Sequence, residues 1–259
     1  MRMVSLRDIQ SITANPRLIA IGAHPDDCEV KFGATAARLA AAGAAVKFLS
    51  TTNGDAGHHE LRGRELAARR YGESQEAARR LGIAEYEILD NHDGELVPSL
   101  EVRRQIIAAI RNWQADVVLA PRPNDYHPDH RYTGMLVQDT AYMVTVPAIV
   151  PEVPALRSNP VFLYFEDNFR LPAPFRADLT VPLGEFREAK IAGLDAHESQ
   201  FYEWLPWLDG CLSEVPREAS ARREWLVKAR AEFLSDEQFE LCEYGRRLTA
   251  AELRAIFRV

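Results

Sequence analysis

Short apolar runs alternate with longer segments of helical character along the first half of the chain. The expected strands are Arg17–Gly22, Val46–Thr51, Tyr86–Leu89 and Val117–Ala120, and the expected helices are Lys31–Ala42, Arg62–Leu81 and Leu100–Trp113. This alternation is typical of right-handed βαβ units, which build a parallel sheet with helices on its faces. We therefore expect an α/β fold with a Rossmann-like, doubly wound, mostly parallel sheet in a strand order of about 3-2-1-4-5.

The second half of the chain has a different character. Six prolines fall between Pro147 and Pro174 and break this stretch into loops. Further strands are expected at Val161–Phe165 and Asp178–Val181, helices near Gly184–Phe201 and Ala219–Leu234, and a last helix after the capping-box sequence Thr249–Glu252. Since no linker is apparent, we expect one domain over residues 1–259. Its core would span about 17–200, and a helical extension over about 201–259 would wrap the sheet.

Composition excludes several functional classes. The net charge is −7, which disfavours nucleic acid, because a nucleic-acid site needs a basic surface. Three cysteines far apart in sequence do not suggest a disulfide scaffold. Residues 1–17 hold no continuous apolar stretch, and the apolar region Ala141–Leu156 is interrupted by prolines. We expect a soluble, cytoplasmic protein that does not bind membranes.

Histidines follow the expected strands closely. His24 comes after the first strand, His58 and His59 after the second, His92 after the third, and His127 and His130 after the fourth. In an open parallel sheet, the loops at the carboxyl ends of the strands form the ligand-binding edge. The histidines therefore mark the expected functional site.

Two clusters at this edge favour a metal site. Ala23-His-Pro-Asp-Asp-Cys-Glu29 follows the first strand, and Asn124-Asp-Tyr-His-Pro-Asp-His130 follows the fourth. The expected strand order makes these strands neighbours, so the two clusters would face each other. Imidazole and carboxylate groups are the ligands of zinc sites with an open coordination position. Carboxylates this close together also repel one another unless a cation lies among them.

Two alternatives compete with the metal site. A single His-Pro-Asp sequence is often a plain turn, in which proline fixes φ and aspartate binds backbone amides. Two copies at matching strand ends favour the metal over this alternative. A dinucleotide site would need a glycine-rich loop after the first strand, where this chain has Gly22-Ala-His-Pro-Asp-Asp27.

These segments resemble the PIG-L (LmbE-like) family of zinc-dependent deacetylases, whose members characteristically act on N-acetylglucosamine-containing molecules. The resemblance rests on Ala23-His-Pro-Asp-Asp27 with Glu29 and on His127-Pro-Asp-His130, and extends to Thr52-Asn-Gly-Asp-Ala-Gly57, Arg70 with Glu73, and His197-x-Ser-Gln200. It covers roughly Leu18 to Gln200.

The resemblance implies roles for individual residues. The metal ligands would be His24, Asp27 and His130. Asp26 would be the general base, His127 would stabilise the oxyanion or donate a proton, and Asp129 would orient an imidazole. The expected cofactor is Zn²⁺, although Fe²⁺ or Co²⁺ could occupy the same ligands.

Other residues are weaker candidates for substrate binding. They are Arg70, Asn53, Asp55, His58 and His197. Each has a structural alternative: an ion pair with Glu73 for Arg70, turn chemistry for the loop residues, and core packing for His197. Tyr202, Trp204 and Trp207 could cover a sugar face or form core or a subunit interface. In some members of the family that this chain resembles, a tyrosine at the position of Asp125 can contact the reacting carbonyl. Here Tyr126 lies one residue later, so the resemblance does not assign it this role.

The leading hypothesis is a zinc-dependent hydrolase that removes an N-acetyl group from an acetylated amino sugar or its conjugate. The alternatives are a zinc amidase for a non-sugar or larger amide, and a metal-binding protein without turnover. Asp26 and His127 argue against the last, since binding alone needs neither a base nor a donor. The expected partner is a small N-acetylated molecule, and the resemblance together with the proline-broken region predicts a homo-oligomer.

Overall fold

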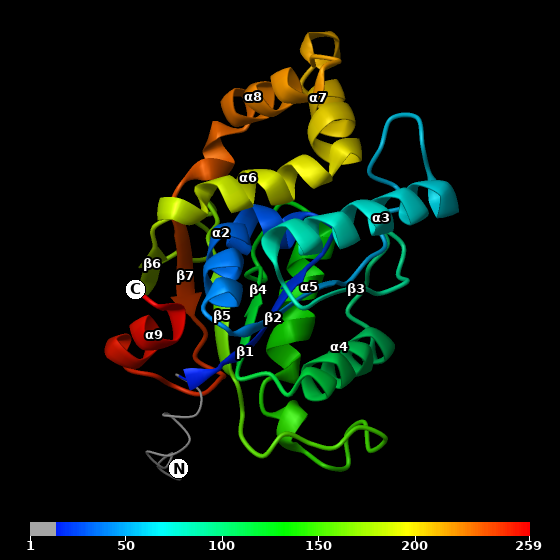
Figure 1. The fold of residues 1–259 in the computed structure, drawn as a ribbon. Coiled ribbons are helices and arrows are strands. Elements are labelled where there is room, and N and C mark those ends of the chain that lie inside the picture. The colour runs from blue at the N-terminus through cyan, green and yellow to red at the C-terminus, as the bar shows by residue number, and fades with distance from the viewer. Residues whose placement is uncertain (1–13) are drawn as a thin grey trace.

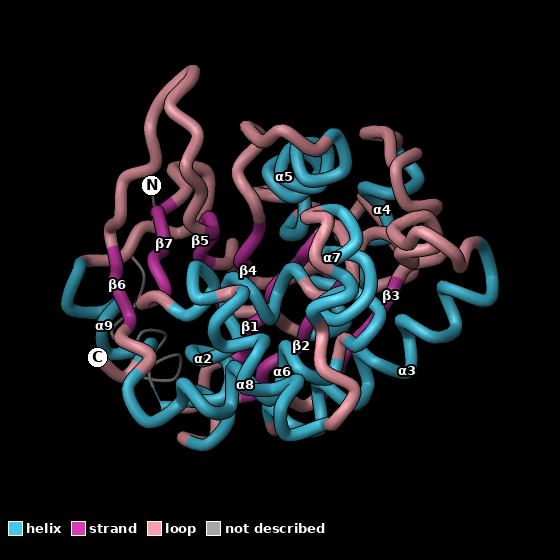
Figure 2. Tube along the Cα trace, turned by 90° about the horizontal axis from the view of Figure 1, so that it is seen from above, coloured by secondary structure: helices cyan, strands magenta, loops and turns pink. Residues whose placement is uncertain are grey.

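The computed structural model describes residues 14–259, so the expectation about a signal sequence falls almost entirely outside the described residues. These residues contain a seven-stranded sheet in the order β3-β2-β1-β4-β5-β7-β6, which can be followed from right to left in Figure 2. The strands are β1 (Arg17–Gly22), β2 (Ala45–Ser50), β3 (Glu85–Ile88), β4 (Val117–Ala120), β5 (Val161–Phe165), β6 (Leu179–Val181) and β7 (Glu237–Leu241). Strands β1 to β5 are parallel, which confirms the expected fold class and strand order.

Helices cover both faces of the sheet. Helices α4 (Leu100–Trp113) and α5 (Pro128–Thr140) lie on one face, and α2 (Asp27–Ala41), α3 (Gly63–Leu81) and α6 (Arg187–Ala196) lie on the other (Figures 1 and 2). Alternation along β1 supplies both cores. Leu18 and Ala20 pack on the α2 side, and Ile19 and Ile21 pack on the α4 side. All four side chains are fully buried, which accounts for the continuous apolar run in the sequence.

Strand β7 and helix α5 were not anticipated. Strand β7 has the sequence EQFEL, whose charged residues hide its strand character, and it pairs antiparallel with both β5 and β6. Its Glu237 is buried because its carboxylate binds Lys190 Nζ at 2.7 Å. Helix α5 contains Gly134, which normally weakens a helix. A Cβ at Gly134 would lie 2.7 Å from the carbonyl oxygen of Pro121, so only glycine allows α5 to pack this closely against the loop after β4.

The long helix expected over Gly184–Phe201 is interrupted. A 3₁₀ turn (Gly184–Phe186) precedes α6, which ends at Ala196, and a π-helical turn (Ser199–Trp204) leads into the short α7 (Leu205–Leu208). π-helical turns often occur at functional sites. Helix α8 (Ala219–Ala229) and a 3₁₀ turn (Ala231–Leu234) follow, and α7 and α8 project together at the top of Figure 1.

The last helix, α9 (Ala250–Phe257), begins as expected. Thr249 and Glu252 form the complete capping box: the Thr249 hydroxyl accepts the Glu252 N–H, and the Glu252 carboxylate accepts the Thr249 N–H. Leu253, Ile256 and Phe257 bury its apolar face in the core on the α2 side. Within residues 14–259, no helix combines the length and the apolar character required to cross a lipid bilayer.

Candidate active site

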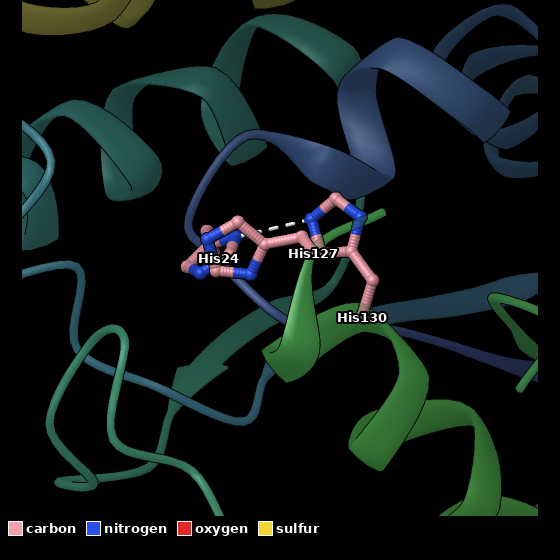
Figure 3. A group of neighbouring side chains, drawn as sticks. All are labelled: His24, His127 and His130. Carbon is pink, nitrogen blue, oxygen red and sulfur yellow. Dashed lines mark hydrogen bonds between the residues drawn. The ribbon is translucent and has the colours of Figure 1, made fainter. Parts of the chain in front are cut away.

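The two histidine clusters meet at the carboxyl ends of β1 and β4. These strands pair in parallel at the centre of the sheet, so the loops that leave them are neighbours. The loop after β1 carries His24, Asp26 and Asp27, and the loop after β4 carries His127 and His130 into the start of α5. In Figure 3, the imidazoles from the two loops lie beside one another, and a hydrogen-bond contact joins His24 to His130.

Helix α2 starts inside the first loop, one turn before the expected position. Its first residue is Asp27, whose Oδ2 accepts the N–H groups of Ala23 at 2.8 Å and His24 at 2.9 Å. This folds the loop back on itself and brings Asp27 against the end of β1. A Cβ at Gly22 would lie 2.7 Å from Cβ of Asp27, so the turn requires glycine there.

Helix α5 is started by the second cluster itself. Pro128 occupies its first turn, where proline is favoured because no N–H is needed. His127 caps the helix: its Nδ1 accepts the N–H of Asp129 at 3.2 Å, and its own N–H binds Oδ1 of Asp125 at 2.9 Å. The His-Pro-Asp sequence is therefore a helix start that also presents two imidazoles to the loop after β1.

Three side-chain atoms form a compact triangle suited to a metal ion. His24 Nδ1 lies 3.2 Å from His130 Nε2 and 3.8 Å from Asp27 Oδ2, and His130 Nε2 lies 3.5 Å from Asp27 Oδ2. Ligand atoms held about 2.0–2.1 Å from a tetrahedral zinc ion lie about 3.3–3.4 Å apart. The spacing and the nitrogen-and-oxygen donor set fit zinc, with one coordination position left for water or substrate.

Carboxylates behind the imidazoles fix their orientation. His24 Nε2 binds Asp93 Oδ1 at 3.1 Å and Asp129 Oδ2 at 3.2 Å, and His130 Nδ1 binds Asp125 Oδ2 at 3.2 Å. Hydrogen bonds of this kind orient histidine ligands and raise their basicity in metal sites. They direct the opposite nitrogen of each ring, Nδ1 of His24 and Nε2 of His130, toward Asp27.

Two other groupings have metal-like spacing: His24 with His127 and His130, and His24 with Asp93 and Asp129. The second uses the carboxylates on the far side of the His24 ring. In the first, His127 already uses Nδ1 as the helix cap, which leaves Nε2 for another role. The triangle that includes Asp27 instead uses the ring nitrogens that point away from Asp93, Asp125 and Asp129, and its carboxylate oxygen also accepts two backbone N–H groups.

The electrostatics of the cluster call for positive charge at its centre. Burial favours neutral His24, but hydrogen bonds to Asp129 and Asp93 outweigh it and raise the pKa of His24 to about 10. Burial likewise opposes protonation of His130, yet Asp27 and Asp125 raise the pKa of His130. A divalent cation bound to the imidazole nitrogens would supply the same positive charge without protonation of the rings.

Asp26 lies beside the triangle in an unusual conformation. Its φ of 139° is strained for a residue with a Cβ, and such strain clusters at functional sites. Tyr86 fixes the backbone of Asp26, since its hydroxyl accepts the Asp26 N–H at 3.2 Å. Arg70 donates to Pro25 O at 2.7 Å and to Asp26 Oδ1 at 3.3 Å. Burial raises the pKa of Asp26 to about 6, against the opposing charge of Arg70.

His127 lies against His24, and its two ring nitrogens have different surroundings. The cap uses Nδ1 as an acceptor, which assigns the proton of the neutral ring to Nε2. Its ring meets the ring of His24 edge-on, with centroids 4.7 Å apart. Burial and the neighbouring charges of His24 and His130 lower the pKa of His127.

The five predicted substrate-binding residues occupy different places. Arg70 lines the cavity described below but is buried beneath Asp26. Asn53 and Asp55 bind the loop after β3 instead: Asn53 Nδ2 donates to Asp90, and Asp55 binds His92 Nδ1 and the N–H of Asp93.

The remaining two are His58 and His197. His58 Nε2 binds Glu203 Oε2 at 2.8 Å. His197 is fully buried and binds Glu29 Oε1 at 2.9 Å. Neither residue, and neither Asn53 nor Asp55, is among the described residues that line the cavity.

Sequence reasoning missed the contribution of the loop after β3. Asp93 contacts His24, and the N–H of Gly94 binds Asp129 Oδ2 at 2.7 Å. The signal was available, because Asn91-His-Asp-Gly94 follows a strand that ends at the same edge of the sheet. Tyr86 and Glu29 were also missed as supports of Asp26, and no local pattern in the sequence pairs them.

A cavity of about 710 Å³ opens above these groups. The groups on its floor include His24, Asp26, Asp27, His127 and His130. Another part of its lining is largely apolar and comes from the π-helical turn, α7 and Phe233. Loop residues 166–169, which follow β5, complete the rim, and Arg122 braces them through two 2.6 Å contacts to the carboxylate of Asp167.

Comparison with known proteins places this arrangement in a family. Residues 19–141 match the PIG-L family, described as GlcNAc-PI de-N-acetylase. The chain is 31% identical over 202 residues to the diacetylchitobiose deacetylase of Thermococcus kodakarensis, and the match covers 74% of each protein.

Solved structures share the fold at lower identity. The N,N'-diacetylchitobiose deacetylase of Pyrococcus horikoshii superposes with a TM-score of 0.69 at 24% identity, over 93% of this chain and 94% of that one. The 4-carboxy-2-hydroxymuconate hydratase GalB of Pseudomonas putida also gives a TM-score of 0.69, at 19% identity, over 90% of this chain and 98% of that one. The fold alone therefore does not determine the reaction. The family match and the extended identity to the Thermococcus enzyme confirm what the paired His-Pro-Asp segments indicated: the chain belongs to the PIG-L family of deacetylases.

Proposed function

We propose that this protein is a metal-dependent hydrolase that removes the N-acetyl group from an acetylated amino sugar or its conjugate. His24, Asp27 and His130 would hold the metal, with zinc favoured by the donor set and Fe²⁺ or Co²⁺ as alternatives. The observation that carries the proposal is the triangle of 3.2, 3.5 and 3.8 Å formed by these side chains beside the strained Asp26.

An amide carbonyl is a poor electrophile, and water is a poor nucleophile. When bound, zinc supplies a Lewis acid for the carbonyl oxygen and lowers the pKa of water to about 7. Asp26 is the base in this proposal, because it lies next to the ligands without belonging to the triangle. Its raised pKa of about 6 makes it a better proton acceptor than an exposed carboxylate while leaving it ionised at neutral pH.

His127 is the donor in this proposal. The Nε2–H assigned by the helix cap can stabilise the developing oxyanion or protonate the leaving amine. Arg70 would keep Asp26 in place through the loop carbonyl of Pro25, so its role is to position the base. Asp129 and Asp93 would hold the His24 ring.

The substrate class follows from the chemistry and from the relatives. The Thermococcus relative is named for diacetylchitobiose, an acetylated amino sugar, and it shares 31% identity with this chain. The cavity of about 710 Å³ falls within the range of small-molecule sites. Both observations support an N-acetylated amino sugar as the substrate of this chain.

The direct test is acetate release from a panel that contains N-acetylglucosamine, N,N'-diacetylchitobiose and an N-acetylated amino acid. We expect release from the sugars, loss after treatment with a strong chelator, and recovery when zinc is restored. His130→Ala should abolish release, whereas the control His92→Ala should retain it, because His92 is exposed and contacts only Asp55 among these groups. Acetate release that survives both chelation and His130→Ala would overturn the proposal.

A further inference from the structure

Part of the rim of the cavity is a loop that makes few hydrogen bonds of its own. We define the rim loop as residues 166–175, which follow β5 and contain no helix or strand. Asp167, Asn168 and Phe169 line the cavity that holds the candidate metal ligands. Among the hydrogen bonds of residues 14–259, one joins two members of this loop, from the Phe169 N–H to Asp167 Oδ1 at 2.9 Å. The loop therefore depends on other parts of the chain for its shape.

Arg122 supplies most of that support. Its Nε and Nη2 donate to the two carboxylate oxygens of Asp167, at 2.6 Å each. The same guanidinium donates to the carbonyl oxygens of Phe169 at 3.1 Å and Ala173 at 3.0 Å. It also lies over the ring of Phe175, 5.7 Å from the ring centroid. One buried side chain thus joins four residues that are spread along the rim loop.

The arginine is itself held firmly. Arg122 follows β4 closely, and a Cβ at Gly134 of α5 would lie 2.8 Å from the carbonyl carbon of Arg122. Because α5 also carries His130, the rim loop and the second histidine cluster share one support. A planar guanidinium that binds both oxygens of a carboxylate fixes orientation as well as distance, which the ammonium group of a lysine cannot do.

Two side chains of the rim loop are available to a substrate. Phe169 lies beside Tyr126 with ring centroids 6.5 Å apart, and the Tyr126 ring lies 5.8 Å from that of His127. Asn168 lines the cavity, and none of the hydrogen bonds among residues 14–259 involves its amide. An amide with free donors and a free acceptor suits a ligand that is rich in hydroxyl groups.

We propose that Arg122 is a positioning residue of the deacetylation reaction, which holds the rim loop so that Asn168 and Phe169 contact the substrate. The inference rests on the proposed function, since it takes an N-acetylated sugar to bind in this cavity. Arg122 acts through the loop, because all three of its nitrogens are occupied by Asp167 and by backbone carbonyl groups. When fewer molecules hold the loop in the binding position, KM rises in proportion and kcat at saturation is retained.

The first test compares acetate release by Arg122→Lys and by the wild type, with N-acetylglucosamine and N,N'-diacetylchitobiose as substrates. Lysine keeps the charge and loses the paired contacts. A loop in the binding position in about one tenth of the molecules raises KM about tenfold, and we expect this rise with kcat within about twofold and zinc content unchanged. Arg176→Lys is the matched control, because the Arg176 side chain is 76% exposed just beyond the rim loop and approaches Asp178 only to 4.0 Å. A wild-type KM in Arg122→Lys, or loss of its zinc, would overturn the inference.

A double-mutant cycle separates positioning from a general effect on the fold. Asn168→Ala alone should raise KM about fivefold, as expected for the loss of one hydrogen bond to the substrate. In that background, Arg122→Lys should raise KM only about twofold further, because part of the contribution of the loop is already lost. Effects on KM that multiply in full would contradict an action of Arg122 through Asn168 and Phe169.

Limited cleavage by trypsin follows the loop without any turnover. Arg170 is exposed in the rim loop and precedes Leu171, which is 80% exposed. We expect Arg122→Lys to be cut after Arg170 about tenfold faster than the wild type or Arg176→Lys, since cleavage tracks the population of the open form. Cleavage at equal rates, or faster cleavage throughout the chain, would refute a role confined to the loop. If the proposed function fails, neither sugar releases acetate from the wild type, and the rate of cleavage after Arg170 still decides whether Arg122 holds the loop.

Discussion

Asp26 combines a strained backbone with contacts from two other parts of the chain. Its positive φ is maintained by the Tyr86 hydroxyl on its N–H and by Arg70 on its carboxylate and on Pro25 O. Tyr86 in turn donates to Glu29, which binds His197. Strained residues persist only when their surroundings over-determine them, and this buried chain of contacts does so for Asp26.

Tyr86→Phe tests that support. The variant removes the acceptor of the Asp26 N–H and leaves a buried donor unpaired, at about 1 kcal/mol or more. We expect kcat to fall about 5–10-fold while metal content stays at the wild-type level, measured by acetate release and elemental analysis. Tyr71→Phe is the control, because Tyr71 is 54% exposed on α3. Unchanged kcat in Tyr86→Phe would show that Asp26 does not depend on this bond.

Asp125→Ala tests the orientation of His130, which we propose as a metal ligand. Asp125 holds His130 Nδ1 at 3.2 Å and receives the N–H of His127, so its loss frees both rings. Removal of such an outer carboxylate commonly weakens metal binding about 10–100-fold, and we expect that range in a zinc competition titration. Asp139→Ala is the control, since Asp139 is exposed on α5 and pairs with Arg103 of α4. Equal zinc affinity in both variants would remove Asp125 from the site.

For individual residues, the sequence predicts contacts between neighbours in the chain and between loops that follow neighbouring strands. The clusters around His24 and His130 could be placed face to face because each follows a strand and those strands are neighbours. Asp93 and Tyr86 escaped prediction because their contacts depend on side-chain direction across loops distant in sequence. His197 illustrates the reverse case: its family-like motif suggested the cavity, but the ring is buried against Glu29.

The π-helical turn Ser199–Trp204 determines the shape of the cavity at the level of elements. It redirects the chain after α6, so that Phe201 and Trp204 face the cavity while Ser199 and Glu203 face α3. A regular helix that continued through this stretch would distribute the same side chains differently. The interruption at His197 therefore helps to bring Phe201 and Trp204 into the lining of the cavity.

Glu203→Gln tests the anchor of the turn through its pH dependence. Burial acts to raise the pKa of Glu203, but hydrogen bonds from Arg69 and His58 outweigh it and lower that pKa below the ordinary value of 4.5. A carboxyl with a lowered folded-state pKa stabilises the fold above its ordinary pKa and loses this contribution as the pH falls through the folded-state value. We expect the variant to lose about 1–2 kcal/mol at pH 7 and progressively less below about pH 4.5.

Urea unfolding at several pH values measures this difference in the free energy of unfolding. Glu198→Gln is the control, because Glu198 is 46% exposed and forms a surface ion pair with Arg222. It should change stability by less than about 0.5 kcal/mol. A difference in the free energy of unfolding between the wild type and Glu203→Gln that stays constant from pH 7 to pH 3 would contradict the assigned role.

Prediction of the elements succeeded where one physical signal dominated. Buried parallel strands are continuous apolar runs, and Arg17–Gly22, Val117–Ala120 and Val161–Phe165 match the structure residue for residue. It failed for β7 and α5, where charged residues and Gly134 oppose the local propensity. In both cases a tertiary contact compensates: Lys190 for Glu237, and the close approach to Pro121 for Gly134.

At the scale of the whole molecule, the proline-rich segment is organised by one buried arginine. Arg111 of α4 donates to six backbone carbonyl groups between Met143 and Val153, at 2.5–3.0 Å. A segment with few elements of its own thus obtains six of its hydrogen bonds from a single guanidinium. This explains how a proline-broken loop can cover the α4 side of the core.

Arg111→Met should therefore destabilise the fold without altering the site. The variant leaves several buried carbonyl groups without donors, and we expect a loss of about 3–5 kcal/mol in the free energy of unfolding. Urea denaturation measures the loss, and zinc stoichiometry at low temperature should remain unchanged, because this segment does not line the cavity. Arg103→Met on the same helix is the control, with a change of less than about 0.5 kcal/mol. Equal stability of the two variants would contradict the bracing role of Arg111.

The central claim is a division of roles within one adjacent pair: Asp27 holds the metal, and Asp26 takes the proton. The most direct measurement is zinc content and kcat, determined together, for Asp26→Asn and Asp27→Asn. We predict that Asp26→Asn keeps zinc near the wild-type stoichiometry and loses about 10²–10⁴-fold in kcat, because the amide is nearly isosteric but cannot accept the proton. Asp27→Asn should lose zinc itself. The account is contradicted if Asp26→Asn loses zinc while Asp27→Asn retains it.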